Sequence, residues 1–180
     1  MKNYFSKMKG QTQSPPLVPF NEVVWSWIGG FLGLSLIGWL GATQDLLGSE
    51  RLFLIGSFGA SAVLIYGAPS VLYAQPRNLV GGHIISALLG VAVARYVNLP
   101  LEITGPLVVA TAIAAMHLTN TIHPPGGATA LIAVLGGPKI QALGFSYVLT
   151  PVAIGAVLLL IVALVVNNIP ASRSYPVFWR

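Results

Sequence analysis

The sequence contains no cysteine and very few charged residues. Only 7% of its 180 residues are charged, and four of them are Asp or Glu. The missing thiols exclude disulfides, thiolate metal ligands, iron–sulfur clusters and cysteine nucleophiles. The low charge excludes an ordinary soluble domain, in which roughly 25% of residues are charged. The chemistry of this chain therefore rests on other side chains, in a setting other than water.

Signals for nucleotides and nucleic acids are also missing. The pattern GxxxxGK[ST] does not occur, and the Gly-Gly-Pro-Lys run at 136–139 has the wrong spacing for a phosphate-binding loop. Nine Lys and Arg give a net charge of +5, but so few charges in an apolar chain indicate membrane topology. We expect no cofactor and no nucleic-acid partner.

What the chain does have is long apolar runs. Hydrophobic residues make up 55% of it, and the mean hydropathy is +0.80. A helix needs about 20 residues to cross a bilayer, so the length allows five or six short spans. Long runs cover 24–40, 79–97, 104–119 and 145–166, and shorter ones cover 52–67 and 128–135. The prediction is an all-α polytopic membrane protein with four full transmembrane helices and two short or broken segments.

The charged residues divide the chain into two tails and a membrane domain. We expect a cytoplasmic tail at 1–22, one transmembrane domain at 23–168 and a cytoplasmic tail at 169–180. The first tail lacks the apolar core of a secretory signal, which favours the inner (plasma) membrane of a prokaryote. Six positively charged residues fall on the cytoplasmic side and three, including Arg51, on the other side. The split is the same whether the short segments cross the membrane or re-enter it, so the positive-inside rule leaves the number of crossings open.

Two stretches of the sequence resemble each other. GASAVL at 59–64 and GATALI at 127–132 each lie in a short run between two long ones. This arrangement is typical of a duplicated transporter with a broken helix in each half, here 23–98 and 103–168. The alternative is that small residues simply recur where membrane helices pack closely.

The few polar residues at membrane depth are candidates for function, because they are costly in lipid and normally face a path or a bundle interior. The three histidines of the chain, His83, His117 and His123, fall in or beside the apolar runs. No acidic residue lies near them and they show no HxxxH pairing, which disfavours a metal site. A hydrogen bond to a neighbouring helix carbonyl is the alternative role.

The run that follows His123 predicts an anion site. Two prolines carry no backbone donor, two glycines permit a close approach, and a helix beginning at Ala128 has N–H groups without intrahelical partners. Arg77 either adds positive potential or is a surface charge that marks topology. The alternative for the run itself is a Pro/Gly-rich connection that merely breaks the helix. The residues expected to bind the substrate are His123, Gly126, Gly127, Ala128 and Thr129 in the second half, Gly59, Ala60 and Ser61 in the first, and Asn78, His83, Thr119 and Asn120 nearby.

The same run carries a family resemblance. HPPGGATA at 123–130 resembles the signature of the HPP family of integral membrane proteins, and the blocks at 56–62, 74–78 and 82–83 are similar to that family's other shared blocks. The resemblance covers about residues 20–168. It implies four membrane-spanning helices and, for cyanobacterial and chloroplast members, nitrite transport. Other members have no established substrate, so the resemblance leaves the substrate open.

We therefore expect a transporter or channel for a small inorganic anion, with nitrite and nitrogen assimilation as the first candidate. Nitrate, formate, bicarbonate or a neutral solute, and a non-transport assembly subunit, are alternatives. We expect no enzyme, because no buried carboxylate is available to orient a histidine if Ser61, His83 and His123 form a nucleophile and base. The expected partners are the lipid bilayer, the anion and a second copy of the chain, since small residues favour self-association.

Overall fold

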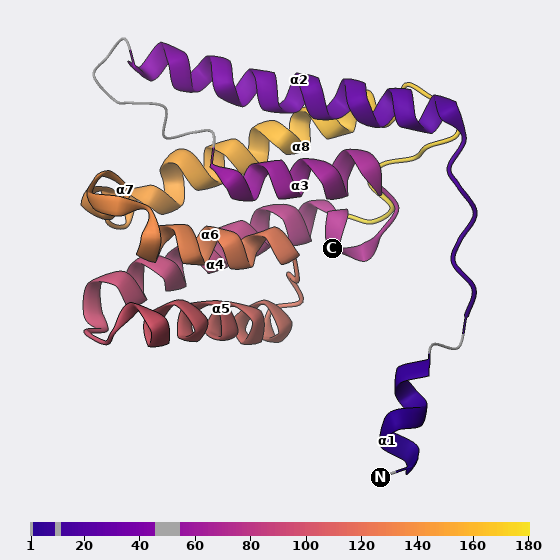
Figure 1. Ribbon diagram of the computed structural model, residues 1–180. Coiled ribbons are helices and arrows are strands. Elements are labelled where there is room, and N and C mark those ends of the chain that lie inside the picture. Colours follow the sequence, from indigo (N-terminus) through magenta and orange to yellow (C-terminus); the bar gives the residue numbers. More distant parts are fainter. Residues whose placement is uncertain (1, 10–11, 46–54) are drawn as a thin grey trace.

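Helices form all the regular structure in the residues that the computed structural model describes, which are 2–9, 12–45 and 55–180. They are α1 (Lys2–Ser6), η1 (Lys7–Lys9), α2 (Phe20–Asp45), α3 (Gly56–Gly67), η2 (Leu72–Ala74), α4 (Pro76–Tyr96), α5 (Leu101–Leu118), α6 (Pro124–Leu135), α7 (Gly137–Leu143), η3 (Val148–Ala153) and α8 (Ile154–Val166). The predicted all-α fold is confirmed (Figure 1).

Four helical stretches are long and apolar enough to cross a bilayer. They are Phe20–Thr43, Pro76–Tyr96, Leu101–Leu118 and Val148–Val166, the last combining η3 and α8. α3 and α6 have 12 residues each, which at about 1.5 Å per residue is too short for a full crossing. Four full spans and two short segments were predicted, and both are present.

One boundary and one additional helix differ from the prediction, and two expectations cannot be compared. α6 begins at Pro124 rather than Ala128, because proline fits the first helical turn, where its missing N–H costs nothing. A further helix, α7, follows where the Gly-Gly-Pro run was expected only to end the half-helix. The expected start of the second run at 52, and Arg51, lie outside the described residues.

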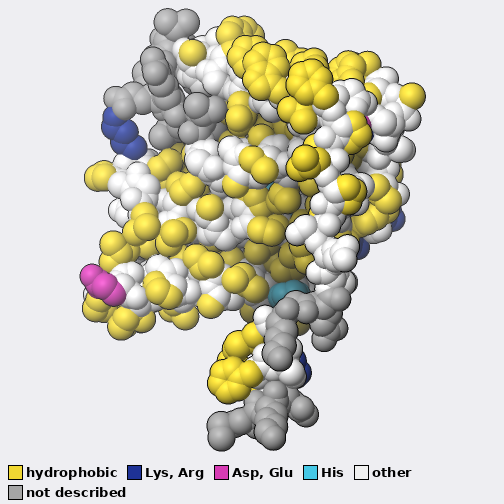
Figure 2. Space-filling model, turned by 45° about the vertical axis from the view of Figure 1, so that its right-hand side comes forward, with side chains coloured by type: hydrophobic (Ala, Val, Ile, Leu, Met, Phe, Trp, Pro, Cys, Tyr) yellow, Lys and Arg dark blue, Asp and Glu magenta, His cyan; other side chains and the backbone are white. Residues whose placement is uncertain are grey.

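The outer surface of the bundle suits lipid. Large apolar side chains are exposed on several helices, among them Trp27 and Trp39 on α2, Val63 on α3, Ile113 on α5 and Val165 on α8. In Figure 2 hydrophobic side chains cover most of the helical body, and the few charged ones lie at its edges. Contact with a bilayer follows from these helices.

The chain reverses direction at every helix of the bundle. In Figure 1, α2, α4 and α6 run one way, and α3, α5 and α8 run the other. The triplet α5, α6, α8 therefore repeats the long, short, long order of α2, α3, α4 with inverted direction. The packing agrees, because α2 contacts α3 and α8, while α5 contacts α6 and α4. This is the arrangement of an inverted repeat.

The short helices match residue by residue. α3 and α6 have the same length. The same difference in residue number separates their first residues, their last residues, and the glycines Gly59 and Gly127. It also separates Ser61 from Thr129. The two helices contact each other at the centre of the bundle. The similarity read from the sequence therefore coincides with equivalent structural elements.

The segment after α8 is tied back to the start of α2 by a buried arginine. Arg173 Nε lies 2.6 Å from Glu22 Oε2, and the guanidinium also donates to Ser26 Oγ, Tyr66 O and Asn167 Oδ1. The side chain of Arg173 is only 4% exposed. The start of α2 and the C-terminal segment therefore lie at the same end of the bundle.

Arg173→Lys is predicted to lower the thermal stability of the protein. A lysine keeps the charge but cannot reproduce the planar fork that reaches several acceptors at once, so buried acceptors lose partners. The expected cost is about 1–3 kcal/mol. Thermal unfolding in detergent, followed by size-exclusion chromatography, measures it, with the exposed Arg180→Lys as the control. Equal stabilities of the two variants would show that this network contributes nothing.

Candidate functional site

Four side chains from three helices meet in the centre of the bundle. Ser61 on α3, His83 on α4, and His123 and Thr129 at the start of α6 are each 0% exposed. Ser61 Oγ lies 2.7 Å from His83 Nε2 and 2.8 Å from His123 Nε2, and Thr129 Oγ1 lies 2.7 Å from His83 Nδ1. These four residues are called the histidine cluster below.

Backbone carbonyls surround the histidine cluster. His123 Nδ1 lies 2.8 Å from the Tyr73 carbonyl oxygen. Ser61 Oγ is also within 3.1 Å of the Ser57 carbonyl oxygen, and Thr129 Oγ1 within 3.4 Å of the Pro125 carbonyl oxygen. Every imidazole nitrogen of the cluster therefore has a partner, as burial in an apolar bundle requires.

The cluster exists because α4 and α6 approach unusually closely. A Cβ at Gly82 would lie 2.6 Å from His123 Cβ, and one at Gly126 would lie 2.7 Å from Ser86 Oγ and 3.0 Å from the Gly82 carbonyl oxygen. Only glycine fits at such contacts. The two glycines let the His123 ring reach across to α3 and α4.

The duplicated motif places one hydroxyl on each side of His83. Ser61 contacts its Nε2 atom and Thr129, the matching residue of the other half, contacts its Nδ1 atom. The inverted arrangement of α3 and α6 brings the two hydroxyls to opposite edges of one ring. The matching residues of the two similar stretches therefore contact the same imidazole ring.

The start of α6 offers few free amides. Pro124 and Pro125 have no N–H, and the N–H of Gly126 donates to the His123 carbonyl oxygen at 2.8 Å. An ordinary helix start leaves four N–H groups without intrahelical partners. Pro125, Gly126, Gly127 and Thr129 are all buried in helix packing. Anion binding at this helix start stays a prediction, since two of its first three residues lack an N–H and the N–H of the third, Gly126, already has a partner.

A small polar pocket lies beside the cluster, at the end of the bundle where α4 begins and α5 ends. Its volume is about 160 Å³, and its walls are Arg77, Asn78, His117 and Asn120 with Leu72, Tyr73 and Ile122. Tyr73, whose carbonyl accepts from His123, is thus shared between the cluster and this polar pocket.

Two polar atoms at the pocket lack partners. Arg77 Nε and Asn78 Oδ1 are buried and have no hydrogen bond to any described residue. Asn78 is 2% exposed, and its Nδ2 donates to the Ile122 carbonyl oxygen at 2.7 Å, which fixes Oδ1 as the free acceptor. Buried polar atoms left unpaired cost about 1–3 kcal/mol each, so the pair favours a bound polar molecule.

The predicted residues therefore separate into distinct places. Ser61, His83, His123 and Thr129 form the cluster, and Arg77, Asn78 and Asn120 line the polar pocket. His117 lies in the pocket wall, so two of the three histidines converge and the third does not. The remaining ones are outside both: Gly126 and Gly127 pack inside the bundle, Ala60, Ala128 and Thr119 are exposed, and Gly59 lines a groove beside α2.

Sequence reasoning missed the groups that hold the cluster in place. The carbonyls of Tyr73 and Ile122 accept from His123 and Asn78, and a backbone carbonyl has no signature in sequence. The Tyr147 hydroxyl donates to the Thr129 carbonyl oxygen at 3.1 Å from a distant segment. As for metals, no three His, Cys, Asp or Glu gather in the described ranges closely enough to share an ion.

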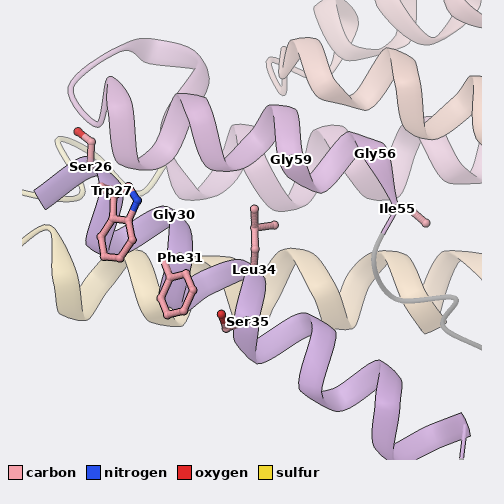
Figure 3. A pocket seen from close by; sticks show the side chains of 9 residues that line it. All are labelled: Ser26, Trp27, Gly30, Phe31, Leu34, Ser35, Ile55, Gly56 and Gly59. Atoms are coloured by element: carbon pink, nitrogen blue, oxygen red, sulfur yellow. The ribbon is translucent and has the colours of Figure 1, made fainter. Parts of the chain in front are cut away.

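Two cavities larger than the polar pocket are apolar grooves on the flanks of the bundle. A groove of about 720 Å³ lies between α2 and α3, with Trp27, Phe31, Leu34 and Ile55 in its walls (Figure 3). Trp27 and Phe31 stack in parallel with ring centroids 5.2 Å apart. A second groove, of about 620 Å³, lies along α5. Both suit lipid chains or helix packing rather than a small polar solute.

The two adjacent glycines of the motif differ in their surroundings, which gives a matched test of why they are there. Gly126→Ala is predicted to lower the thermal stability by about 1–3 kcal/mol, because the new methyl meets backbone of α4. At Gly127 the nearest atom to a Cβ is Val109 Cγ1 at 3.5 Å, an ordinary contact, so Gly127→Ala is expected to be neutral or stabilising. Thermal unfolding compares them, and equal losses would contradict the packing argument.

Comparison with known proteins agrees with this architecture. A family model described as HPP, transmembrane region, matches residues 15–176. Two transmembrane proteins of Dictyostelium discoideum are 48% and 41% identical over 98% of this chain, which spans 57% and 63% of their lengths. No solved structure matches the chain. The chain belongs to the HPP transmembrane family.

Proposed function

We propose that this membrane protein moves a small inorganic anion across the bilayer, with nitrite as the first candidate, and that the polar pocket is where the anion is received. The observation that carries the proposal is the buried, unpartnered Arg77 Nε beside Asn78 in a pocket of about 160 Å³. The guanidinium carbon of Arg77 lies 5.8 Å from the centroid of the Phe178 ring, and its Nε–H is left as a donor for an oxyanion.

The electrostatics of the polar pocket favour negative charge. Arg77 is the charged residue in its wall, and the described lining contains no carboxylate. Arg77 and Asn78 also lie in the first turn of α4, where the helix dipole is positive. A water molecule occupies about 30 Å³ of liquid, so the volume admits a three- or four-atom ion with some of its water.

The passage beyond the pocket is closed in this structure. The histidine cluster is sealed, and towards the other end of the bundle Ala87, Val91, Ala133 and Tyr147 are buried against one another. Movement of an anion therefore requires the short helices to shift relative to α4. Two inverted halves that meet at a central site are the usual basis of such alternating access.

We propose transport rather than catalysis for the Ser61, His83 and His123 arrangement. The Ser61 hydroxyl is 0% exposed and contacts two imidazoles and a carbonyl, which leaves no space for a substrate. The acidic side chains that the structure describes, Glu22 and Glu102, are not among the contacts of either ring. A nucleophile–base pair would need an orienting carboxylate and an open side.

Nitrite uptake into proteoliposomes tests the proposal. Arg77→Gln is predicted to reduce the initial rate about tenfold to a hundredfold, the loss expected for one charge-assisted hydrogen bond. Arg180→Gln is the matched control. The substitution removes the same charge, and Arg180 is exposed and is not among the residues that line the polar pocket. Nitrate, formate, bicarbonate and chloride serve as competitors.

Two results would contradict the proposal in different ways. No uptake of any of these ions above that of protein-free vesicles would favour a non-transport role, such as an assembly subunit. Equal uptake by the Arg77→Gln and Arg180→Gln variants would show that the anion is received elsewhere.

A further inference from the structure

We propose that the transported solute is a weak oxyacid, carried as an anion together with a proton, and that the histidine cluster holds this proton. Nitrous, formic and carbonic acids belong to this class, whereas nitric and hydrochloric acids do not. The inference rests on the proposed function and narrows its substrate class. Two observations carry it: the directions of the hydrogen bonds in the cluster, and the chemistry of the unpartnered atoms in the polar pocket.

The Tyr73 carbonyl fixes the direction of the cluster. A carbonyl oxygen only accepts, so Nδ1 of His123 bears a proton and Nε2 of the neutral ring is an acceptor. Nε2 of His123 then accepts the Ser61 hydroxyl, and Ser61 accepts from Nε2 of His83. Nδ1 of His83 in turn accepts the Thr129 hydroxyl. With both rings neutral, this is the one direction that satisfies every atom.

One added proton gives a second arrangement without a lost hydrogen bond. With a proton on Nε2 of His123, the Ser61 hydroxyl turns to the Ser57 carbonyl oxygen at 3.1 Å and accepts from both rings. The proton can equally rest on His83, in which case Thr129 turns to the Pro125 carbonyl oxygen at 3.4 Å. The added proton therefore has two possible positions, Nε2 of His123 facing Ser61 and Nδ1 of His83 facing Thr129.

A second added proton is disfavoured. The ring centroids of His83 and His123 are 4.9 Å apart, so two imidazolium ions would repel at close range in an apolar interior. The cluster is built to take up one proton and no more.

The added proton needs a negative charge from outside the protein. The other titratable or charged groups around the two rings are the Tyr147 hydroxyl, which donates to the Thr129 carbonyl, and Arg77 and His117 beyond Tyr73 in the polar pocket. Of the described carboxylates, Glu22 pairs with the C-terminal segment and Glu102 is exposed at the start of α5. An anion arriving beside the cluster supplies the charge, so anion and proton stabilise each other.

The polar pocket itself matches a protonated acid better than a bare anion. Two residues of its lining each have a buried atom without a hydrogen bond to the described residues, the donor Arg77 Nε–H and the acceptor Asn78 Oδ1. Nitrite, nitrate and chloride offer only acceptors. An oxyacid that keeps its proton offers an acceptor to Arg77 and an O–H to Asn78, and satisfies both atoms.

The proton transfer balances without any co-reactant. The O–H bond of the acid breaks, an N–H bond forms at Nε2 of His123, and the anion keeps the electron pair. The Ser61 hydroxyl turns to Ser57 in the same step. The Tyr73 peptide separates the cluster from the pocket in this structure and contacts Nδ1 of His123, so exchange takes place when that wall opens and the His123 ring turns its Nε2 atom towards the pocket.

The first test compares four ions in proteoliposomes that contain a pH-sensitive dye, with the leak of protein-free vesicles subtracted. Nitrite and formate are expected to enter with about one proton each, and nitrate and chloride at least tenfold more slowly. Ser61→Ala and Thr129→Val should lose the proton-coupled uptake. Thr111→Val is the matched control, because that hydroxyl contacts only the Leu107 carbonyl of its own helix.

The second test needs no variant and therefore survives any loss of folding. The chain has three histidines, so nitrogen-15 NMR of histidine-labelled wild-type protein gives one set of signals per ring. Without substrate, His123 should carry its proton on Nδ1 and His83 on Nε2. On addition of nitrite, one of these two rings should gain a second proton while the other stays neutral.

The outcomes separate this inference from the proposed function. Nitrate entering as fast as nitrite without acidification would overturn the weak-acid inference and leave anion transport standing. No flux of any of the four ions would overturn both. The same tautomer on His83 and His123, or simultaneous protonation of both, would overturn the assignment of the proton to the cluster.

Discussion

The contact on which the rest of the structure depends is the Ser61 hydroxyl, which lies between the imidazoles of His83 and His123. Ser61 and His83 come from one half of the inverted repeat, and His123 comes from the other. In an apolar interior each of these groups is expensive unless it is paired. The α3, α4 and α6 helices are therefore held at distances that satisfy all three side chains, and the glycines at 82 and 126 make those distances possible.

The requirement that buried polar atoms be paired is met in the histidine cluster and is not met in the polar pocket. Every nitrogen of the cluster has a partner, whereas two polar atoms of the neighbouring pocket have none among the described residues. A satisfied network rigidifies a core, and an unsatisfied pair in a cavity invites a ligand. The unpartnered atoms therefore lie one layer outward from the buried motif, on the first turn of α4.

The sequence was sufficient for the parts of the fold that follow from hydropathy and local backbone chemistry. Four long helices, two short ones and the matched motifs around Ser61 and Thr129 could be predicted, because apolar run length and small-residue patterns are local properties. The meeting of His83 with His123 could not be predicted, because it depends on helix packing across the two halves. The roles of the Tyr73 and Ile122 carbonyls were invisible for a different reason, since every residue carries a carbonyl.

The two halves have diverged in a way that surrounds the cluster differently on its two sides. Where the second half has His123 at the N-cap of α6, the first has Ile55 at the N-cap of α3. Where the second half has Gly126, the first has Phe58, whose ring meets His83 edge-on at 5.3 Å and fills the space left by Gly155. Apolar residues therefore close one approach to the histidines, while the polar pocket beside Tyr73 lies on the other. The pair of short helices has kept a hydroxyl in each half, at Ser61 and Thr129, and each half contributes one histidine, His83 from the first and His123 from the second.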